Sequence, residues 1–164
     1  MRSSHSKRLV RIFAQTDERE LSVYKPVCTL VRPFVARGVL ESPLQAARFV
    51  SLIPFERVEL AGEGRVERWH LISSFLARGC GDSEDHAVLL CSLLLGFSMK
   101  AYVCSGTNGE GAHTWVITVD QDSKKVQFWE SLTGQRFVEG DPRVQRFFRT
   151  VDCVFNNGEF YANL

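Results

Sequence analysis

A dense apolar run covers residues 87–95 and follows directly on a cluster of charged residues. Asp82, with Asp85 three residues further on, is a favourable helix N-cap, and Gly96 fits the left-handed position beyond a helix end. Because apolar residues fill almost every position of the run, the helix that they predict is covered on all sides. We therefore expect a buried central helix with Ser83 in its first turn, where unpaired backbone N–H groups and the helix dipole stabilise an anion.

Two amphipathic helices are predicted ahead of this central helix. Ser42 and Gln45 fit the capping box of the first helix, and Pro43 takes its first helical position. Pro54 ends it. Its expected buried face is Ala46, Phe49, Val50 and Ile53. The stripe of the second helix, which runs towards Gly79, is Trp69, Ile72 and Leu76. Only a few residues separate the second helix from the central one, which predicts that the two lie side by side.

An alternating pattern replaces the helical period after the central helix. Short runs rich in Val, Ile, Thr and aromatic residues indicate consecutive antiparallel strands at 101–104, 113–120 and 125–130. Helices first and strands afterwards predict an α+β fold, and without a repeat or linker residues 1–164 are expected to form a single domain. Before the first helix we predict a strand at 9–14 and an edge strand at 28–35 around Pro33, and between the first two helices a loop at 62–64. After the strands we predict a short helix at 142–149 with Val144, Phe147 and Phe148 inward, then a last strand at 151–155 and a turn at 156–158.

Composition narrows the possible functions. With 164 residues, of which 45% are hydrophobic, the chain is long enough for one domain with a sizeable core. A net charge of +1 argues against bulk electrostatic binding to nucleic acid or anionic membranes. The five cysteines are odd in number and contain no Cys-x-x-Cys pair, which favours reduced core thiols in a cytosolic protein. No apolar run has membrane-spanning length, and neither a metal nor a cofactor is expected.

Few side chains point to chemistry on their own. His113 shares a strand face with Trp115, and such a histidine is more often structural than catalytic. Glu130 ends the next strand, where a carboxylate is usually solvated. Trp115 and Trp129 are more often core or cleft wall than ligand contacts, although aromatic walls suit an extended peptide. His86, one turn into the central helix, could line the same cleft but is expected to form hydrogen bonds at a packed helix start.

The segment Gly81-Asp-Ser-Glu-Asp-His-Ala87 resembles the transglutaminase-like motif of the papain-like class, Gly-Asp-Cys-x-Asp-x-Ala, with serine in the place of cysteine. Tyr102–Thr107, His113–Val116 and Phe128–Gly134 extend the likeness to the transglutaminase-like domains of centrosomal and ciliary proteins, from about residue 27 to residue 137. The resemblance implies a papain-like α+β fold in which a central buried helix packs on an antiparallel sheet.

The resemblance also implies roles for individual residues. Ser83 stands in the position of the nucleophile, and His113 in that of the general base. Glu130 stands where the family usually has aspartate as the acid that orients the imidazole and stabilises its protonated form. The residues expected to line a substrate cleft are Trp115, Trp129 and His86.

Serine in the place of cysteine at position 83 leaves three classes of function to consider. A histidine readily draws a thiol into a thiolate, whereas a hydroxyl needs base and oxyanion hole aligned during attack itself. The resemblance therefore favours a catalytically inactive module, in the cytoplasm at the centrosome, centriole or ciliary base, that contributes to centriole or cilium organisation. It would bind centriolar proteins or peptides such as acidic tubulin C-terminal tails, with Arg143, Arg146 and Arg149 as a local basic site. The alternatives are a cysteine peptidase-like acyl-transfer enzyme whose nucleophile is replaced by Ser83, and a purely structural centriolar docking domain.

Overall fold

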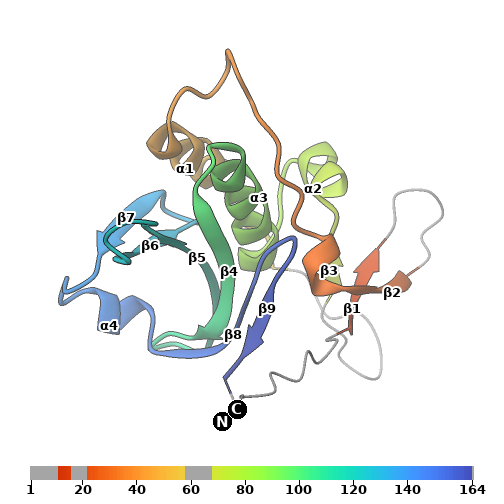
Figure 1. Cartoon of the computed structure of the whole chain (residues 1–164). Helices are drawn as coiled ribbons and strands as arrows, with labels where there is room; N and C mark the ends of the chain where they lie inside the picture. Colours follow the sequence, from red (N-terminus) through yellow and green to blue (C-terminus); the bar gives the residue numbers. More distant parts are fainter. Residues whose placement is uncertain (1–10, 16–21, 58–67, 164) are drawn as a thin grey trace, which may run out of the picture.

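A six-stranded antiparallel sheet with a long helix packed on it is the centre of the fold (Figure 1). The structure, a computed structural model, describes residues 11–15, 22–57 and 68–163. The helices are the 3-10 helix η1 (Val27–Thr29), α1 (Pro43–Ser51), α2 (Ile72–Arg78), α3 (Ser83–Gly96) and α4 (Val144–Phe147). The strands are β1 (Arg11–Gln15), β2 (Ser22–Pro26), β3 (Arg68–His70), β4 (Lys100–Thr107), β5 (Ala112–Val119), β6 (Val126–Glu130), β7 (Gln135–Val138), β8 (Thr150–Phe155) and β9 (Phe160–Ala162).

The strand order of the large sheet is β7-β6-β5-β4-β8-β9, and each neighbouring pair is antiparallel. The predicted run of consecutive antiparallel strands, here β4, β5 and β6, is therefore confirmed, as is the α+β class. The alternating pattern missed β7 and β9, because strands of four and three residues show too little alternation to be recognised. A smaller sheet has the order β2-β1-β3. Strand β1 covers part of the strand predicted at 9–14, whose first two residues lie outside the described part of the chain, as does the loop predicted at 62–64.

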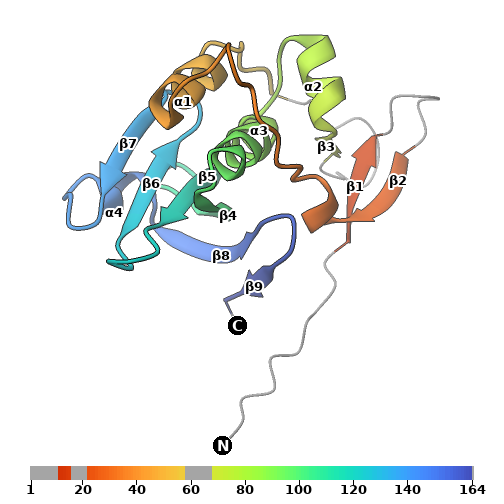
Figure 2. The same ribbon diagram turned by 45° about the horizontal axis from the view of Figure 1, so that its top comes forward.

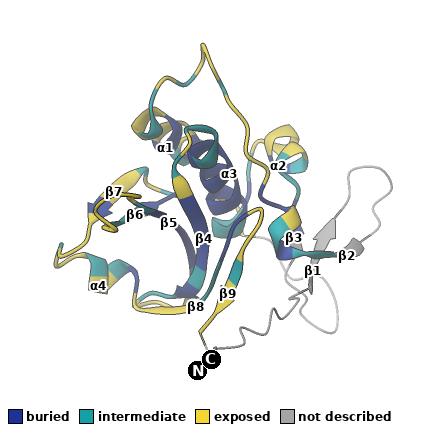
Figure 3. Cartoon of the chain, viewed as in Figure 1, coloured by how far each residue is buried: buried dark blue, intermediate teal, exposed yellow. Residues whose placement is uncertain are grey.

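Helix α3 is the buried centre of the molecule, as its apolar pattern predicted. Figure 2 shows α1 and α2 on either side of it, with the large sheet beneath. Asp82 accepts the backbone N–H of Asp85, and the Asp85 side chain accepts that of Asp82, so the capping box is complete. Ten consecutive residues from Asp85 to Leu94 are buried (Figure 3). Each leucine removed from water in this run contributes about 1.5–3 kcal/mol, so α3 is a principal source of stability.

The prediction for Gly96 was wrong. This residue is the last of α3, in helical conformation, and the positive φ beyond the helix belongs to Ser98, at 62°. A Cβ at Gly96 would overlap the backbone carbonyl of Phe34, which crosses the helix at that point. Glycine is therefore required here for close approach of two backbones and not for a left-handed turn.

Helix α1 begins as predicted, with Ser42 accepting the backbone N–H of Gln45 at 3.2 Å and Pro43 as the first helical residue. The capping box is incomplete, since the Gln45 side chain accepts the backbone N–H of Glu41, one residue earlier. The buried residues of α1 are Ala46, Ala47 and Val50. Phe49, predicted to be buried, is 40% exposed, because the helix turns the two small alanines towards α3.

The second predicted helix is shorter than its stripe suggested. Trp69 belongs to β3, which pairs in parallel with β1, and α2 begins only at Ile72. The buried residue of α2 is Phe75, which packs against the ring of His86 on α3, while Leu76 is 44% exposed. The predicted proximity of α2 to α3 is therefore confirmed, and Gly79 ends the helix in the left-handed conformation with φ of 68°.

The edge strand predicted at 28–35 was also wrong. Residues 27–29 form η1, and the extended segment that follows pairs with no strand of the described structure. Its backbone is held by α3 instead: the N–H of Arg32 donates to the Ser92 hydroxyl at 3.1 Å, and that of Phe34 to the Ser92 carbonyl at 3.4 Å. Pro33 between them has no N–H, which suits a segment that is not part of a hydrogen-bonded ladder.

A second, smaller core covers the face of the sheet opposite α3. It is formed by Cys104, Trp115, Phe137 and Phe148, with Val144 and Phe147 of α4 partly buried against it. The helix predicted at 142–149 is thus present over a shorter range and packs the expected side chains inward. This core fixes the position of the first residues of β5, where His113 lies.

Candidate functional site

Ser83 is the first residue of α3, and backbone hydrogen bonds hold the chain just before it, at Gly81. The N–H of Gly81 donates to the Pro54 carbonyl at 3.2 Å, and the N–H of Glu56 donates to the Gly81 carbonyl at 2.8 Å. A Cβ at Gly81 would overlap the Asp85 carboxylate and the ring of Phe75. The glycine of the motif is therefore needed because two side chains fill the space beside it.

Asp85 ties the start of α3 to the smaller sheet. Its carboxylate accepts three N–H groups: the backbone N–H of Asp82 at 3.2 Å, the backbone N–H of His70 at 3.2 Å and His70 Nδ1 at 3.0 Å. His70 Nε2 lies 2.7 Å from Nη1 of Arg78, and a guanidinium can only donate. His70 is therefore the neutral tautomer with its proton on Nδ1. The second aspartate of the motif thus positions the residue at 83 and does not face it as an acid or base.

The Ser83 hydroxyl is bonded to its neighbour on the helix. Ser83 Oγ donates to Glu84 Oε2 at 3.0 Å, and the other carboxylate oxygen of Glu84 accepts the Thr114 hydroxyl at 3.2 Å. Glu84 therefore joins the first turn of α3 to the strand that carries His113. In the described part of the chain no direct hydrogen bond connects Ser83 with His113.

His113 and Glu130 form a close pair on adjacent strands. His113 Nε2 lies 2.6 Å from Glu130 Oε2, and the two side chains are only 10% and 6% exposed. Glu130 Oε1 accepts the backbone N–H of Leu132 at 3.2 Å, which fixes the carboxylate. With Glu130 ionised, Nε2 carries the proton and donates, so Nδ1 is left as the acceptor. Among the described residues Nδ1 has no hydrogen-bond partner.

Aromatic rings hold the imidazole of His113 on its strand. Trp115 stacks on it at a centroid distance of 5.8 Å and an interplanar angle of 22°, and Phe148 at 6.4 Å and 19°. A carboxylate that fixes one imidazole nitrogen while the other stays open is the arrangement that a general base requires. The pair could act on a proton only if a donor reached Nδ1, and the Ser83 hydroxyl is directed to Glu84 instead.

Comparison with known proteins decides the family. The family model described as the CEP76 peptidase-like domain matches residues 67–164. The chain belongs to this family. The resemblance to centrosomal proteins inferred from the motif is therefore confirmed. That residues 1–164 form one domain stays a prediction.

The relatives that this chain matches are much longer proteins. The chain is 47% identical to the protein named "Centrosomal protein of 76 kDa" of Xenopus tropicalis and 43% identical to the one of Homo sapiens. Both alignments cover 99% of the chain but 26% of the relative, so the chain spans about a quarter of the length of these relatives. The human "Protein CC2D2B" is 34% identical over 72% of the chain and 8% of that protein.

A solved structure confirms the fold. Calcium-bound LapG of Legionella pneumophila matches with a TM-score of 0.60 and 15% identity, over 73% of this chain and 66% of that one. At that identity the likeness concerns the fold alone, which is of the transglutaminase-like peptidase type predicted from the motif.

The three residues expected to line a substrate cleft are interior in this CEP76 peptidase-like domain. Trp115 and His86 are 0% exposed and Trp129 is 1% exposed. Trp129 donates its indole N–H to the Thr118 hydroxyl at 3.0 Å, and His86 lies between the carbonyls of Asp82 and Ile53. A bound peptide cannot reach side chains that the core covers. We therefore assign these residues to the support of the site and not to its surface.

Sequence reasoning missed Glu84 and Thr114. Glu84 occupies the variable position of the motif, so the motif gives no reason to single it out. Thr114 is on the strand face opposite His113, and only the packing of α3 on β5 brings its hydroxyl to Glu84. The sequence signal that could have identified Glu84 is an acidic residue directly after the nucleophile position, because its carboxylate competes for the proton on the nucleophile side chain.

Asp82, Glu84 and Asp85 place three carboxyl groups at the start of α3, and the pKa of Asp82 is raised there. Burial is the largest cause, followed by the charges of Asp85 and Glu84, and together they raise this pKa to about 8. Asp82 is therefore largely protonated at neutral pH. An anion that developed at Ser83 would lie beside the Glu84 carboxylate, which accepts the Ser83 hydroxyl, so this negative charge opposes the stabilisation that the helix dipole offers.

The raised pKa of Asp82 predicts how stability depends on pH. The folded state binds the proton more tightly than the unfolded chain, so the free energy of unfolding should fall as pH rises from about 4 to about 8. Asp82→Asn keeps an N-cap oxygen but removes this titration. We expect the variant and the parent to have equal free energies of unfolding near pH 4, and the variant to be more stable by about 2 kcal/mol at pH 9. The difference is no larger because the Asp82 side chain is only partly buried, so solvent screens its charge.

Urea denaturation of both proteins at pH 4, 6, 8 and 9 measures this difference. Asp122→Asn is a matched control, because Asp122 is an exposed aspartate in a turn outside the site. A constant difference between Asp82→Asn and the parent at all four values would contradict the assigned titration.

No described cysteine offers a thiolate in place of Ser83. Cys80 donates to Glu56 at 2.7 Å, and the Glu56 carboxylate raises the pKa of this thiol. Burial raises the pKa values of Cys91 and Cys104. All five cysteines are free thiols.

The described residues contain no group of three or more His, Cys, Asp or Glu side chains suited to hold a metal ion. Within the same residues, no helix has both the length and the apolar character needed to cross a membrane.

Proposed function

We propose that this CEP76 peptidase-like domain is a catalytically inactive module of a centrosomal protein, which acts there by binding a peptide or protein partner. The observation that carries the proposal is the hydrogen bond from Ser83 to Glu84. The side chain in the nucleophile position is an alcohol, and its proton is directed to a carboxylate that also accepts from Thr114. The base that would have to activate it, His113, is paired with Glu130 and has no direct bond to Ser83.

The physical chemistry of an alcohol makes this arrangement inert. A serine hydroxyl becomes a nucleophile only when a base removes its proton during attack and fixed donors stabilise the oxyanion. Here the neighbouring acceptor is a carboxylate, and negative charge at the start of α3 destabilises both an alkoxide and an oxyanion. Loss of one such stabilising contact typically costs an enzyme a factor of about 100–1,000 in rate. A site that combines these defects has no useful turnover.

The partner that the family suggests, an acidic tubulin tail or a centriolar protein, would meet the domain away from Ser83. A carboxylate-rich peptide is repelled by Glu84 and Asp85 at the start of α3. On the other side of His113, Arg146 and Arg149 are exposed beside Phe148, whose ring stacks on the imidazole. Arg143 already pairs with Asp141 at 2.7 Å. We therefore propose Arg146 and Arg149 as the contact for acidic segments.

Fluorescence anisotropy with labelled tubulin C-terminal tail peptides tests the binding function. We expect native tails to bind more tightly than composition-matched scrambles, and the affinity to fall with salt because exposed charges are screened over about 8–10 Å. Arg146→Gln with Arg149→Gln should weaken binding by about fivefold. The matched control is Lys124→Gln with Lys125→Gln, which removes the same charge at the other end of β5. Equal affinity for native and scrambled tails in all variants would favour a purely structural docking domain.

A further inference from the structure

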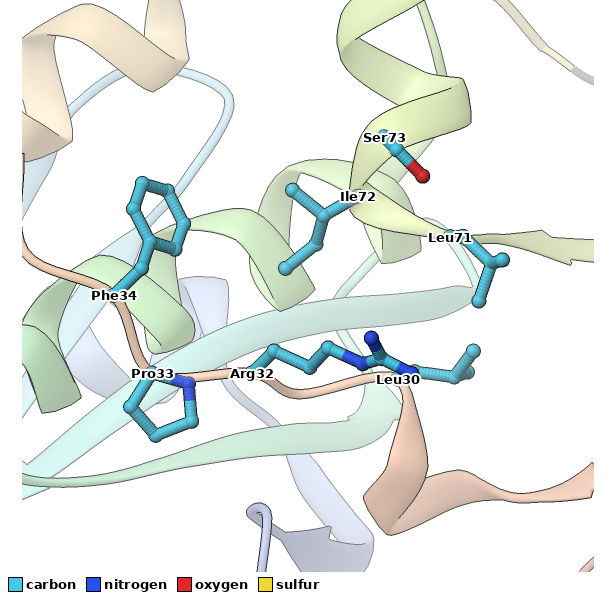
Figure 4. Close-up of a pocket in the computed structure, with 7 residues that line it drawn as sticks. All are labelled: Leu30, Arg32, Pro33, Phe34, Leu71, Ile72 and Ser73. Carbon is cyan, nitrogen blue, oxygen red and sulfur yellow. The ribbon is translucent and has the colours of Figure 1, made fainter. Parts of the chain in front are cut away.

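A cavity of about 250 Å³ lies between the extended segment after η1 and the start of α2. It is lined by Leu30, Arg32, Pro33, Phe34, Leu71, Ile72 and Ser73. Figure 4 shows Phe34 and Ile72 on its two sides, with the side chain of Arg32 running below Ile72 towards Leu30 and Leu71. Apolar cavities of about 150 Å³ accept a molecule of the size of benzene, so this one has room for one large apolar side chain.

Both walls of the cavity are fixed, so a ligand would not have to order them. Ser92, which is fully buried, accepts the backbone N–H groups of Arg32 and Phe34 and donates its own hydroxyl to the Val88 carbonyl at 2.8 Å. Gly96 admits the Phe34 carbonyl, and this contact holds the end of the segment against α3. On the opposite wall, Phe75 anchors α2 in the core. A preformed site saves the ordering entropy that a mobile one must lose on binding.

Arg32 gives the cavity a charge preference. Its side chain is exposed, and among the described residues no carboxylate lies within ion-pair distance of it. Its guanidinium group can therefore pair with a carboxylate of a ligand whose apolar group occupies the space between Phe34 and Ile72. The lining residues come from the segment after η1 and from the start of α2, and they include none of Ser83, His113 and Glu130, so the cavity is a different site from that centre.

We propose that this cavity is a second binding site, for an extended protein segment that carries one large apolar side chain next to a carboxylate. The apolar side chain enters the cavity, and the carboxylate beside it pairs with Arg32. This site is independent of the inactive centre at Ser83 and of the proposed contact at Arg146 and Arg149. It would let the domain hold an acidic segment although the start of α3 repels one.

The test is a titration of ¹⁵N-labelled protein, followed by NMR, with the peptide acetyl-Gly-Ser-Glu-Phe-Glu-Ser-Gly-amide. We expect backbone amide shifts at 30–32, at Phe34 and at 71–73, and none at Ser83 or His113. Replacing Phe by Ala in the peptide should weaken binding by about tenfold, and replacing both Glu by Lys by at least about threefold. Arg32→Gln should also weaken binding of the glutamate peptide, by about threefold, because it removes the positive partner of the ion pair. Arg37→Gln is the matched control on the same segment outside the cavity.

Each variant is first compared with the parent by its thermal transition and its ¹⁵N spectrum, so that loss of fold is not mistaken for loss of binding. No shift at millimolar peptide, shifts confined to other residues, or equal affinity for the glutamate and lysine peptides would overturn the proposal. Shifts confined to His113, Arg146 and Arg149 would overturn the cavity site but would agree with the binding function proposed for the domain. If only the tail-binding experiment failed, the cavity site would stand alone.

Discussion

Replacing Gly96 by alanine is expected to destabilise the domain by about 2–3 kcal/mol. In an ordinary helix this change would add about 1 kcal/mol of stability through helix propensity. Here the added Cβ overlaps the backbone carbonyl of Phe34, so either the end of α3 or the segment before α1 must move. Overpacking of this kind usually costs about 1–3 kcal/mol, and displacement of the segment also lengthens the hydrogen bond from Phe34 to Ser92. The overlap therefore outweighs the propensity.

Chemical denaturation of Gly96→Ala beside Gly109→Ala measures this cost. Gly109 is the matched control, because a Cβ there meets no atom within 4 Å. We expect the denaturation midpoint of Gly109→Ala to stay close to that of the parent. A midpoint for Gly96→Ala that equals or exceeds the parent value would show that the close approach of the two backbones is not required.

Restoring a thiol at position 83 is expected to give a reactive cysteine only when Glu84 is also neutralised. In Ser83→Cys the carboxylate of Glu84 lies next to the sulfur and keeps its proton on, as Glu56 does for Cys80. In Ser83→Cys with Glu84→Gln this charge is gone, and the helix dipole with His113 favours the thiolate. We expect iodoacetamide at pH 6.5 to label position 83 at least about tenfold faster in the double variant than in Ser83→Cys.

Peptide mapping by mass spectrometry assigns the label to position 83 and separates it from the five native thiols. Ser83→Cys with Glu110→Gln is the matched control, since Glu110 is an exposed glutamate in the turn before β5. Adding His113→Ala to the fast variant should remove most of the gain. Equal labelling rates in Ser83→Cys and both double variants would contradict the role assigned to Glu84.

Local signals in the sequence predicted the elements whose causes are local. Asp82 and Asp85 form a complete capping box because both partners lie within one turn, and β4, β5 and β6 follow from alternation along each strand. Gly96 could not be understood in this way, because the reason for glycine is a carbonyl more than sixty residues earlier in the chain. Trp69 appeared helical by its spacing, but pairing with β1, which no local pattern shows, places it in β3.

The same distinction applies to the site. His113, Glu130 and Ser83 were singled out by resemblance to the family motif, and the two strands bring the imidazole and the carboxylate to 2.6 Å. Their catalytic role, or its absence, stays a prediction. The contact from Ser83 to Glu84 depends on side-chain rotamers and on the packing of β5 against α3, which no motif encodes. The burial of Trp115, Trp129 and His86 follows from the arrangement of two cores on either side of one sheet.

Reaction with a fluorophosphonate, which modifies activated serine hydroxyls irreversibly, tests most directly whether Ser83 is inert. The domain is incubated with an excess of the reagent at pH 7.5, and intact-mass spectrometry with peptide mapping quantifies any adduct. We predict no adduct at Ser83, and no difference between the parent and His113→Ala. An adduct approaching one per chain on Ser83, lost in His113→Ala, would show that the histidine activates the hydroxyl and would contradict the proposal of an inactive module.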